Sequence, residues 1–464
     1  MTGSGSGPTP IADLRAFERR REQRAWYYYD WANSAYVTTV ATVLFAPYLT
    51  SVDETAACGP GVTDDNPCHR DLQVLGVAVS PGSLVFYVVT IATITSAIAL
   101  PVVGAGADRS ARKPTLMARY AWIGSLFAAG MFFVSGDNWQ LGAVLLFAAN
   151  ICLGASLVVY DALLCEIATP DERDGVSSRG WALGYLGGGL LLAVNLGIVL
   201  GHDALGVSQG FAVRLCLLSA AAWWAAFTVI PYRGVRGRTP VGRVNESGGL
   251  LRQSFGQLFD TLGDLRRYPV TLTFLVAYLF YNDGIQTVIV TATTYGDKQL
   301  GFSTGVLIAT VLVVQFVAFG GALLFGRIAT TVGSKKTIAA GLVAWMAVVL
   351  MAYALPHKAL VPFLALAVVI GLVLGGTQAL SRSFFSQLIP RGREAEYFSL
   401  YQACERGTSW LGTLVFGVVH QLTGSYRPAI FAVIVFFVIG LTLFVRVDAE
   451  RGIREAGNQP PVVV

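Results

Sequence analysis

The sequence predicts an all-α polytopic membrane protein whose twelve transmembrane helices form two pseudo-symmetric six-helix halves. Three observations support this prediction. The 464 residues are 54% hydrophobic and only 13% charged, whereas soluble domains carry roughly 25% charged residues. Apolar stretches of about 20 residues, the length that crosses a bilayer, recur along nearly the whole chain. A long hydrophilic segment separates the first six stretches from the last six.

The chain starts with a polar segment, residues 1–25, in which a Gly- and Ser-rich stretch precedes a short basic one. We expect this segment to be cytoplasmic and outside the membrane, and it lacks the apolar core of a cleavable signal peptide. The N-terminal half follows over residues 26–231. Its spans are predicted at 26–50, 82–103, 115–135, 139–165, 178–201 and 211–231.

A polar and basic connector, residues 232–268, is predicted to be a cytoplasmic loop between the halves. The C-terminal half follows over residues 269–447, and the tail 448–464 is predicted to be disordered in the cytoplasm. The 51 glycines suit closely packed transmembrane helices, because small residues let backbones approach. The spans of this half are predicted at 269–291, 304–327, 336–355, 360–385, 397–421 and 428–446.

The distribution of Lys and Arg predicts that both termini lie in the cytoplasm. Cationic loops resist translocation and stay on the inner side of the membrane. With twelve spans and inner termini, most of the 33 Lys and Arg residues fall in inner segments. The outer segments then hold only Arg70, Arg214, Lys298, Lys358 and Arg427.

A charged decapeptide, Gly104–Lys113, lies between spans two and three and follows the pattern G-x-x-x-D-R-x-x-R-K. The matching loop of the second half, Gly326–Lys336, keeps the glycines and the terminal cations but has no acidic residue. The two halves are therefore related repeats. Two six-helix repeats about an axis along the membrane normal are a transporter architecture.

The decapeptide resembles the cytoplasmic signature of the major facilitator superfamily of transporters. Three further stretches, Tyr29–Tyr36, Gly180–Gly188 and Tyr281–Thr287, resemble the branch of autophagy-related vacuolar effluxers. Fungal members of that branch are associated with amino-acid efflux from the vacuole. The resemblance therefore implies a secondary transporter for a small polar metabolite, with neutral amino acids as the first candidate. Asp161 departs from the branch, in which an asparagine is expected after Tyr160.

The resemblance also implies that the signature loop gates the cytoplasmic side. Asp108 can accept hydrogen bonds from the exposed N–H groups at the start of a neighbouring helix. Arg109 and Arg112 are expected to pair with Asp161 or Glu166, and the cluster must break for inward opening. Alternatively, the cations only fix the orientation. The candidate gate residues are Gly104, Asp108, Arg109, Arg112, Lys113, Asp161, Glu166, Glu405 and Asp30, with Arg382 as a further partner of Glu405.

Span seven carries a charged residue near its centre, where a charge costs roughly 2.5–3.5 kcal/mol and marks a functional candidate. Asn282, Asp283 and Gln286 are spaced so that they share one helix face. Asp283 is predicted to bind a substrate amine or to carry a coupling proton. The alternative is a structural carboxylate that bonds to a neighbouring helix.

Span one carries a polar stripe, Asp30, Asn33 and Ser34, that ends near Tyr36. Asn33 and Tyr36 are candidates for substrate contact, whereas Asp30 is expected to pair with Arg24 or another loop cation. The aromatic run from Trp26 to Trp31 is predicted to form an interfacial belt. Polar residues within other spans serve either helix packing or substrate contact; they are Asn195, Gln315, Gln378 and Gln402.

Other features limit the function. Cys58 and Cys68 bracket a short stretch of the long outer loop, and the outer side is oxidising, so a disulfide is expected. The four histidines are scattered, and we expect no metal and no cofactor. No phosphate-binding loop and no nucleophile–base pair is present, so an enzyme is not expected.

The expected partners are a small-molecule substrate, the lipid bilayer and coupling protons, with no nucleic acid and a monomeric state. The plasma membrane is the expected location, with a vacuole-like membrane as the alternative. The alternative function is a membrane-embedded ligand sensor or scaffold that moves no solute.

Overall fold

The computed structural model describes residues 16–59, 68, 70–74, 76–240, 263–407 and 409–463. Within these residues, eleven helices are long and apolar enough to cross a membrane. The predicted eleventh span is described as α13 (Glu394–Gly407) and α14 (Ser409–Thr423), and Thr408 between them lies outside the described residues. The central part of the predicted cytoplasmic loop, residues 241–262, also lies outside them.

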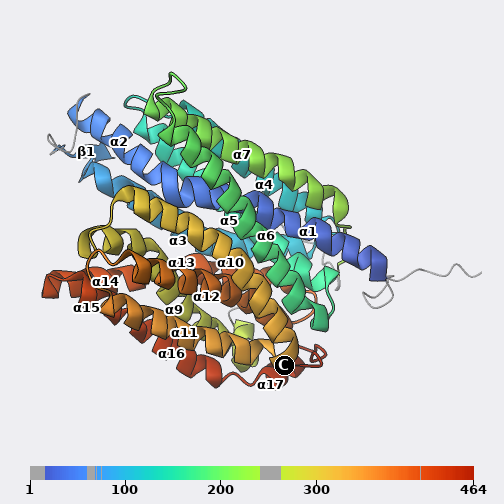
Figure 1. The fold of residues 1–464 in the computed structure, drawn as a ribbon. Coiled ribbons are helices and arrows are strands. Elements are labelled where there is room, and N and C mark those ends of the chain that lie inside the picture. Colours follow the sequence, from blue (N-terminus) through green and yellow to red (C-terminus); the bar gives the residue numbers. More distant parts are fainter. Residues whose placement is uncertain are drawn as a thin grey trace, which may run out of the picture.

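The first half begins with α1 (Ala16–Tyr36), a π-helix (Val37–Leu44) and α2 (Phe45–Cys58), which follow one another without a break. The basic stretch of the predicted N-terminal segment is helical from Ala16 and continues directly into the first span. The other helices of this half, drawn in light blue to green in Figure 1, are α3 (Leu84–Asp108), α4 (Lys113–Gly130), α5 (Trp139–Ile167), α6 (Arg173–Leu200) and α7 (Gln209–Gly234).

The second half, drawn in yellow to red in Figure 1, repeats this arrangement. Its other long helices are α9 (Pro269–Thr294), α10 (Thr304–Val332), α11 (Ser334–Ala354), α12 (Leu360–Gln387), and α15 (Tyr426–Ala432) followed by α16 (Ile434–Val445). The predicted disorder of the tail is wrong for α17 (Ala449–Glu455). This helix is ordered because Asp448 caps its first turn, and Ile453 packs in the core.

The start of α1 and the C-terminal α17 lie at one end of the bundle, which we call the termini side (Figure 1). The end of α2 and the strand β1 lie at the opposite end, which we call the disulfide side. There, β1 (Leu72–Val74) pairs antiparallel with β2 (Val77–Val79) to form a short hairpin. Helix α3 starts after this hairpin on the disulfide side and runs to the other end of the bundle. The signature loop at the end of α3, Gly104–Lys113, therefore lies on the termini side.

Small residues allow helices of different halves to touch. A Cβ atom on Gly104 of α3 would lie 2.4 Å from the backbone oxygen of Ala395 on α13. The matching glycine of the second half, Gly326 on α10, faces Ser178 on α6, where a Cβ atom would lie 2.5 Å from the Ser178 hydroxyl. The two related glycines therefore allow α3 to pack closely on α13, and α10 to pack closely on α6.

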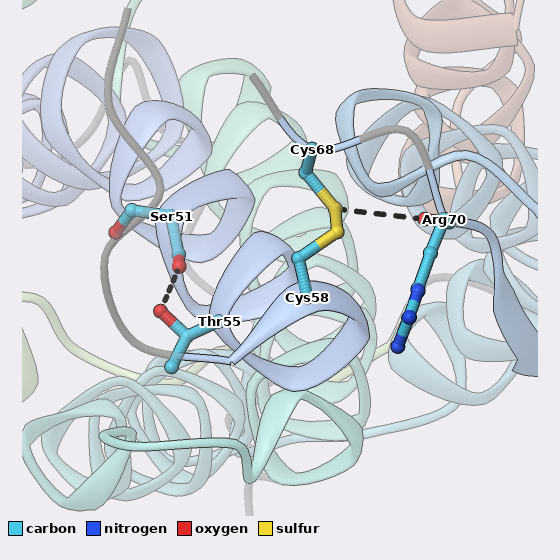
Figure 2. The surroundings of a disulfide bond; sticks show 5 residues. All are labelled: Ser51, Thr55, Cys58, Cys68 and Arg70. Atoms are coloured by element: carbon cyan, nitrogen blue, oxygen red, sulfur yellow. Dashed lines mark hydrogen bonds between the residues drawn. A yellow bond between two sulfur atoms is a disulfide. The ribbon is translucent and has the colours of Figure 1, made fainter. Parts of the chain in front are cut away.

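The expected disulfide is confirmed. Cys58, the last residue of α2, is bonded to Cys68, and their Cα atoms lie 5.8 Å apart (Figure 2). The Cys68 Sγ atom also lies 3.6 Å from the backbone oxygen of Arg70. The bond therefore ties the long loop to the end of α2.

Replacing both disulfide cysteines with serine is expected to lower the free energy of unfolding. The sequence separation is 10 residues, and a closed loop of that size stabilises by roughly 2–3 kcal/mol through the entropy of the unfolded chain. Thermal unfolding of the purified variant, compared with the oxidised wild type, measures this effect. Unfolding of the variant at the wild-type temperature would contradict the expectation.

Candidate functional site

Charged residues join the two halves in successive layers, and the first layer lies at the termini side. Both carboxylate oxygens of Asp108 accept hydrogen bonds of 2.9 Å from the backbone N–H groups of Ala395 and Glu396 in the first turn of α13. The predicted acceptance by Asp108 is thus confirmed. Lys113 completes the layer, since its Nζ lies 3.1 Å from Asp108 and 2.8 Å from Glu166.

The predicted pairing of Arg109 and Arg112 with Asp161 or Glu166 is wrong. Glu166 pairs with Lys113 instead, because Lys113 is the first residue of α4 and its side chain is buried beside α5. Asp161 lies six residues before the end of α5, which is about 9 Å along the helix axis. That depth places Asp161 away from the signature loop and beside a cation of another helix.

The second layer is centred on Arg382 of α12, which is buried between the halves. Its guanidinium lies 2.9 Å from Asp30 of α1 and 3.3 Å from Asp161 of α5. Its Nε donates to the hydroxyl of Ser177 on α6, at 2.9 Å. One cation of the second half is therefore held by two carboxylates of the first half, and the predicted pairing of Asp30 with Arg24 or a loop cation is wrong.

Aromatic rings surround this guanidinium. The Arg382 Cζ atom lies 4.9 Å from the centre of the Trp26 ring and 5.3 Å from that of Tyr160. The Tyr160 hydroxyl donates to Asp30 at 2.7 Å, and the Trp26 indole donates to the Tyr160 backbone oxygen at 2.9 Å. The predicted interfacial belt is therefore wrong for Trp26 and Tyr29, which are fully buried. The Trp26 ring lies over the buried Arg382 guanidinium, and the Tyr29 hydroxyl donates to Ser156 of α5.

Glycines of α6 make room for this layer. A Cβ atom on Gly180 would lie 2.6 Å from an Asp30 carboxylate oxygen, and one on Gly184 would lie 2.7 Å from the Ser34 hydroxyl. Gly188, four residues further, faces Thr38 at 2.6 Å. The glycine-rich stretch Gly180–Gly188 thus forms a small-residue stripe along which α6 packs against α1.

The third layer lies nearer the middle of the bundle, on α13. The Gln402 amide donates to Asp161 at 2.8 Å and to Glu405 at 3.2 Å, while Arg406 donates to the Gln402 oxygen at 3.2 Å. The Asn282 amide of α9 donates to the Glu405 backbone oxygen at 3.0 Å.

The three polar side chains of span seven have different surroundings and do not form one site. Asn282 faces α12 and α13, since its oxygen accepts from Gln378 at 3.0 Å. Asp283 is fully buried and turns toward α14, where the backbone N–H of Gly412 faces it. Neither Asp283 oxygen accepts a hydrogen bond of normal geometry from any residue that the structure describes. Gln286 is only half-buried.

The remaining candidates from the sequence are placed as follows. The Asn33 amide donates to the Tyr29 backbone oxygen at 2.6 Å, within its own helix. Tyr36 is fully buried, and its hydroxyl has no hydrogen-bond partner in the described part of the chain. Asn195 accepts from the Ser219 hydroxyl at 2.9 Å and faces Thr39. Asn195 therefore links α6 to α7 inside the first half, away from the layers.

The sequence did not predict that Arg382 is the centre of the second layer. It indicated Arg382 only as a partner of Glu405. Ser177 and Tyr160 were missed as well. The available signal was the cost of an arginine within an apolar helix, which requires compensating carboxylates at the same depth. Among the described residues, no group of three or more His, Cys, Asp or Glu side chains is placed to hold a metal ion.

Two six-helix halves joined by buried charges define a membrane transporter of the major facilitator type. The human organic anion transporter MFSD10 has a similar fold, with a TM-score of 0.66 and 13% identity over 92% of this chain and 99% of that one. A bacterial homologue of the iron transporter ferroportin, in an outward-facing state, gives a TM-score of 0.63 and 14% identity over 93% of this chain and 99% of that one.

The chain belongs to a particular family of these transporters. Residues 18–457 match the family described as "Vacuole effluxer Atg22 like". The MFS-type transporter YxiO of Bacillus subtilis is 30% identical over 95% of this chain and 99% of its own length. Autophagy-related protein 22 of Pyricularia oryzae is 26% identical over 93% of this chain and 77% of its own length.

Proposed function

We propose that the protein is a secondary active transporter that exports a small polar solute by alternating access, with neutral amino acids as the first candidate class. The observation that carries the proposal is the Arg382 layer, in which a second-half cation is held by two first-half carboxylates. Separating such buried partners is costly, because each charge is then left buried without compensation. An interface of this kind favours discrete arrangements of the two halves.

The position of the contacts between the halves supports one such arrangement. In the part of the chain that the structure describes, side-chain hydrogen bonds between the halves gather toward the termini side. Examples are Arg173 with Ser386 and Ser383 with Asp174. One contact farther along the bundle joins Gln315 to Thr38, at 2.9 Å. The arrangement corresponds to a transporter closed on the termini side.

The family match and the charge distribution supply the rest of the proposal. The family description names a vacuole effluxer, which supports export of a metabolite from a compartment or a cell. The excess of Lys and Arg on the termini side supports a cytoplasmic location of both termini, because cationic segments resist translocation. The plasma membrane is the proposed location, because the oxidising exterior suits the Cys58–Cys68 disulfide.

Counterflow in proteoliposomes tests the proposal. Vesicles loaded with unlabelled neutral amino acids are expected to accumulate the labelled compound only when they contain the protein. Sugars and nucleosides serve as comparison solutes. If one solute class stabilises the purified protein but none shows counterflow, the protein is a ligand sensor and not a transporter.

We further propose that Asp283 carries the coupling proton. Its carboxylate is buried, and no normal hydrogen bond from the described residues holds it in the charged form. The variant Asp283→Asn is expected to keep counterflow but to lose flux driven by a pH gradient. A variant with unchanged pH-driven flux would contradict this assignment, and its unfolding temperature shows whether it is folded.

A further inference from the structure

The segment that follows α17 runs from the second half to the first half on the termini side. Helix α17 rests on the second half, because Ile453 is buried and a Cβ atom on Gly452 would lie 2.5 Å from the Val270 side chain of α9. Gly457 follows this helix with a φ of 72°, a conformation that glycine adopts without strain. We call residues 458–463 the strap. Its starting point is therefore fixed on the second half.

Asn458 anchors the strap to the second half. Its side-chain amide donates to the backbone oxygens of Gln387 and Ile389, at 2.9 and 2.8 Å. Its side-chain oxygen accepts from Arg391 at 3.3 Å. These partners lie at the end of α12 and in the loop between α12 and α13. The side chain therefore uses both of its N–H donors and its oxygen on one half of the molecule.

The far end of the strap reaches the first half. The backbone N–H of Val462 donates to a carboxylate oxygen of Asp171 at 2.7 Å. Asp171 belongs to the one-turn helix Pro170–Glu172, which lies between α5 and α6. This turn is itself held in place, because Glu172 pairs with Arg19 of α1 at 2.9 Å and closes a capping box. The strap therefore binds a fixed corner of the first half.

The strap lies beside another contact between the halves. The Gln387 side chain donates to the Pro170 backbone oxygen at 2.9 Å, next to the carboxylate that receives the strap. A cavity of about 340 Å³ separates the strap from both halves. Its lining includes Pro461, Val462 and Val463 of the strap, Asp171 and Asp174 of the first half, and Ala329 of α10. The strap thus crosses the interface where the termini side is closed.

We propose that the strap locks the termini side in its closed arrangement, and that inward opening requires release of Val462 from Asp171. The inference rests on the proposed function, since inward opening is a step of alternating access. A bond that exists in only one arrangement shifts the equilibrium toward that arrangement. Both residues are exposed, so water can replace the bond when the halves separate.

Two features of the strap suit this role. Pro460 and Pro461 are consecutive, and proline fixes φ, so the free strap loses little conformational entropy when it binds. The match to the effluxer family ends at residue 457. The strap therefore lies beyond the part of the chain on which the family match rests.

Alkylation of the native Cys165, followed by peptide mass spectrometry, tests the strap in the full-length protein in proteoliposomes. This free cysteine is buried near the end of α5, and its Sγ lies 3.8 Å from the Ser386 backbone oxygen of the other half. Its reaction therefore requires the halves to separate. Faster alkylation reports a weaker closed arrangement.

Three variants remove the bond in different ways. Deletion of residues 460–464 removes the far end of the strap and keeps the anchor. Val462→Pro removes the donor N–H, and Asp171→Ala removes the acceptor. Each is expected to speed alkylation of Cys165 about 2–10-fold, which corresponds to the loss of one hydrogen bond.

Val462→Ala is the matched control, because it keeps the backbone N–H and shortens a side chain that is 89% exposed. It is expected to react at the wild-type rate. The deletion combined with Asp171→Ala separates the strap from any other role of Asp171 at the start of α6. This combined variant is expected to react no faster than either change alone, because both changes remove the same bond.

Unchanged alkylation in a deletion variant that unfolds at the wild-type temperature would overturn the inference. Additive effects of the deletion and Asp171→Ala would also overturn it, as would equal rates in Val462→Pro and Val462→Ala. If the deletion variant does not fold, that last comparison decides.

Alkylation does not require movement of a solute, so the test is separate from that of the proposed function. Counterflow with unchanged alkylation in the variants would reject the strap alone. Faster alkylation in the variants, without counterflow of any solute in the wild type, would reject the transporter and keep the strap as a lock between the halves.

Discussion

Arg382→Met is expected to abolish transport and to cause the largest loss of stability of any single substitution in the layers. The change leaves Asp30 and Asp161 buried without their cation, and breaking a buried ion pair from one side costs about 3–5 kcal/mol. Thermal unfolding and counterflow measure the two effects. A variant with wild-type stability and flux would show that the Arg382 layer has no part in joining the halves.

The triple variant Arg382→Met, Asp30→Asn, Asp161→Asn is the matched control for this prediction. It removes all three charges together, and neutral replacement of a whole buried ion set is often close to neutral for stability. Most of the lost stability is therefore expected to return, while flux stays low because the attraction between the halves is gone. Failure of the triple variant to recover stability would point to the rings around Arg382 instead.

Gly104→Val is expected to prevent closure of the termini side. The first carbon of the new side chain would lie 2.4 Å from the Ala395 oxygen, 2.8 Å from its carbonyl carbon and 2.9 Å from the Glu396 Cα atom. All three are backbone atoms, which cannot rotate away as a side chain does. The helices α3 and α13 must then separate, and Asp108 loses both of its hydrogen bonds to the start of α13.

The native Cys165 reports this opening. It is a free cysteine buried at the interface, with its Sγ 3.8 Å from the Ser386 backbone oxygen of the other half. Alkylation at Cys165, followed by peptide mass spectrometry, is expected to be at least tenfold faster in Gly104→Val than in the wild type, which corresponds to roughly 1.4 kcal/mol. Flux is expected to fall in parallel.

Gly106→Ala is the control, because it lies on the same helix and a Cβ atom there meets nothing within 4 Å. This variant is expected to match the wild type in alkylation and in flux. Slow alkylation of Cys165 in Gly104→Val, with a normal unfolding temperature, would contradict the role given to Gly104.

Much of the architecture was predictable because it depends on local properties of the chain. Apolar length located the membrane-spanning helices, and glycine spacing together with Asp108 indicated the crossing of α3 with a neighbouring helix. The signature loop and the span-one motif were sufficient to indicate the family. The disulfide was predictable because Cys58 and Cys68 are close in sequence on one side of the membrane.

The partners of the buried charges were not predictable in the same way. Helical periodicity shows which face of α1 carries Asp30, but it contains no information on which of the other helices packs against that face. The sequence therefore offered Arg24 as the partner of Asp30, although its partner Arg382 is 352 residues away. The aromatic run was likewise assigned to the membrane surface, because sequence alone does not reveal a charge that the rings must cover.

The sequence by itself thus determined the membrane class, the two repeats and the family, since these follow from composition and short motifs. The tertiary structure alone decided that Asp30, Asp161 and Arg382 form one buried set and that Asp108 accepts from the start of α13. The physical reason is that these contacts join helices from opposite halves. Their energy depends on how the halves pack, which is a property of the whole chain.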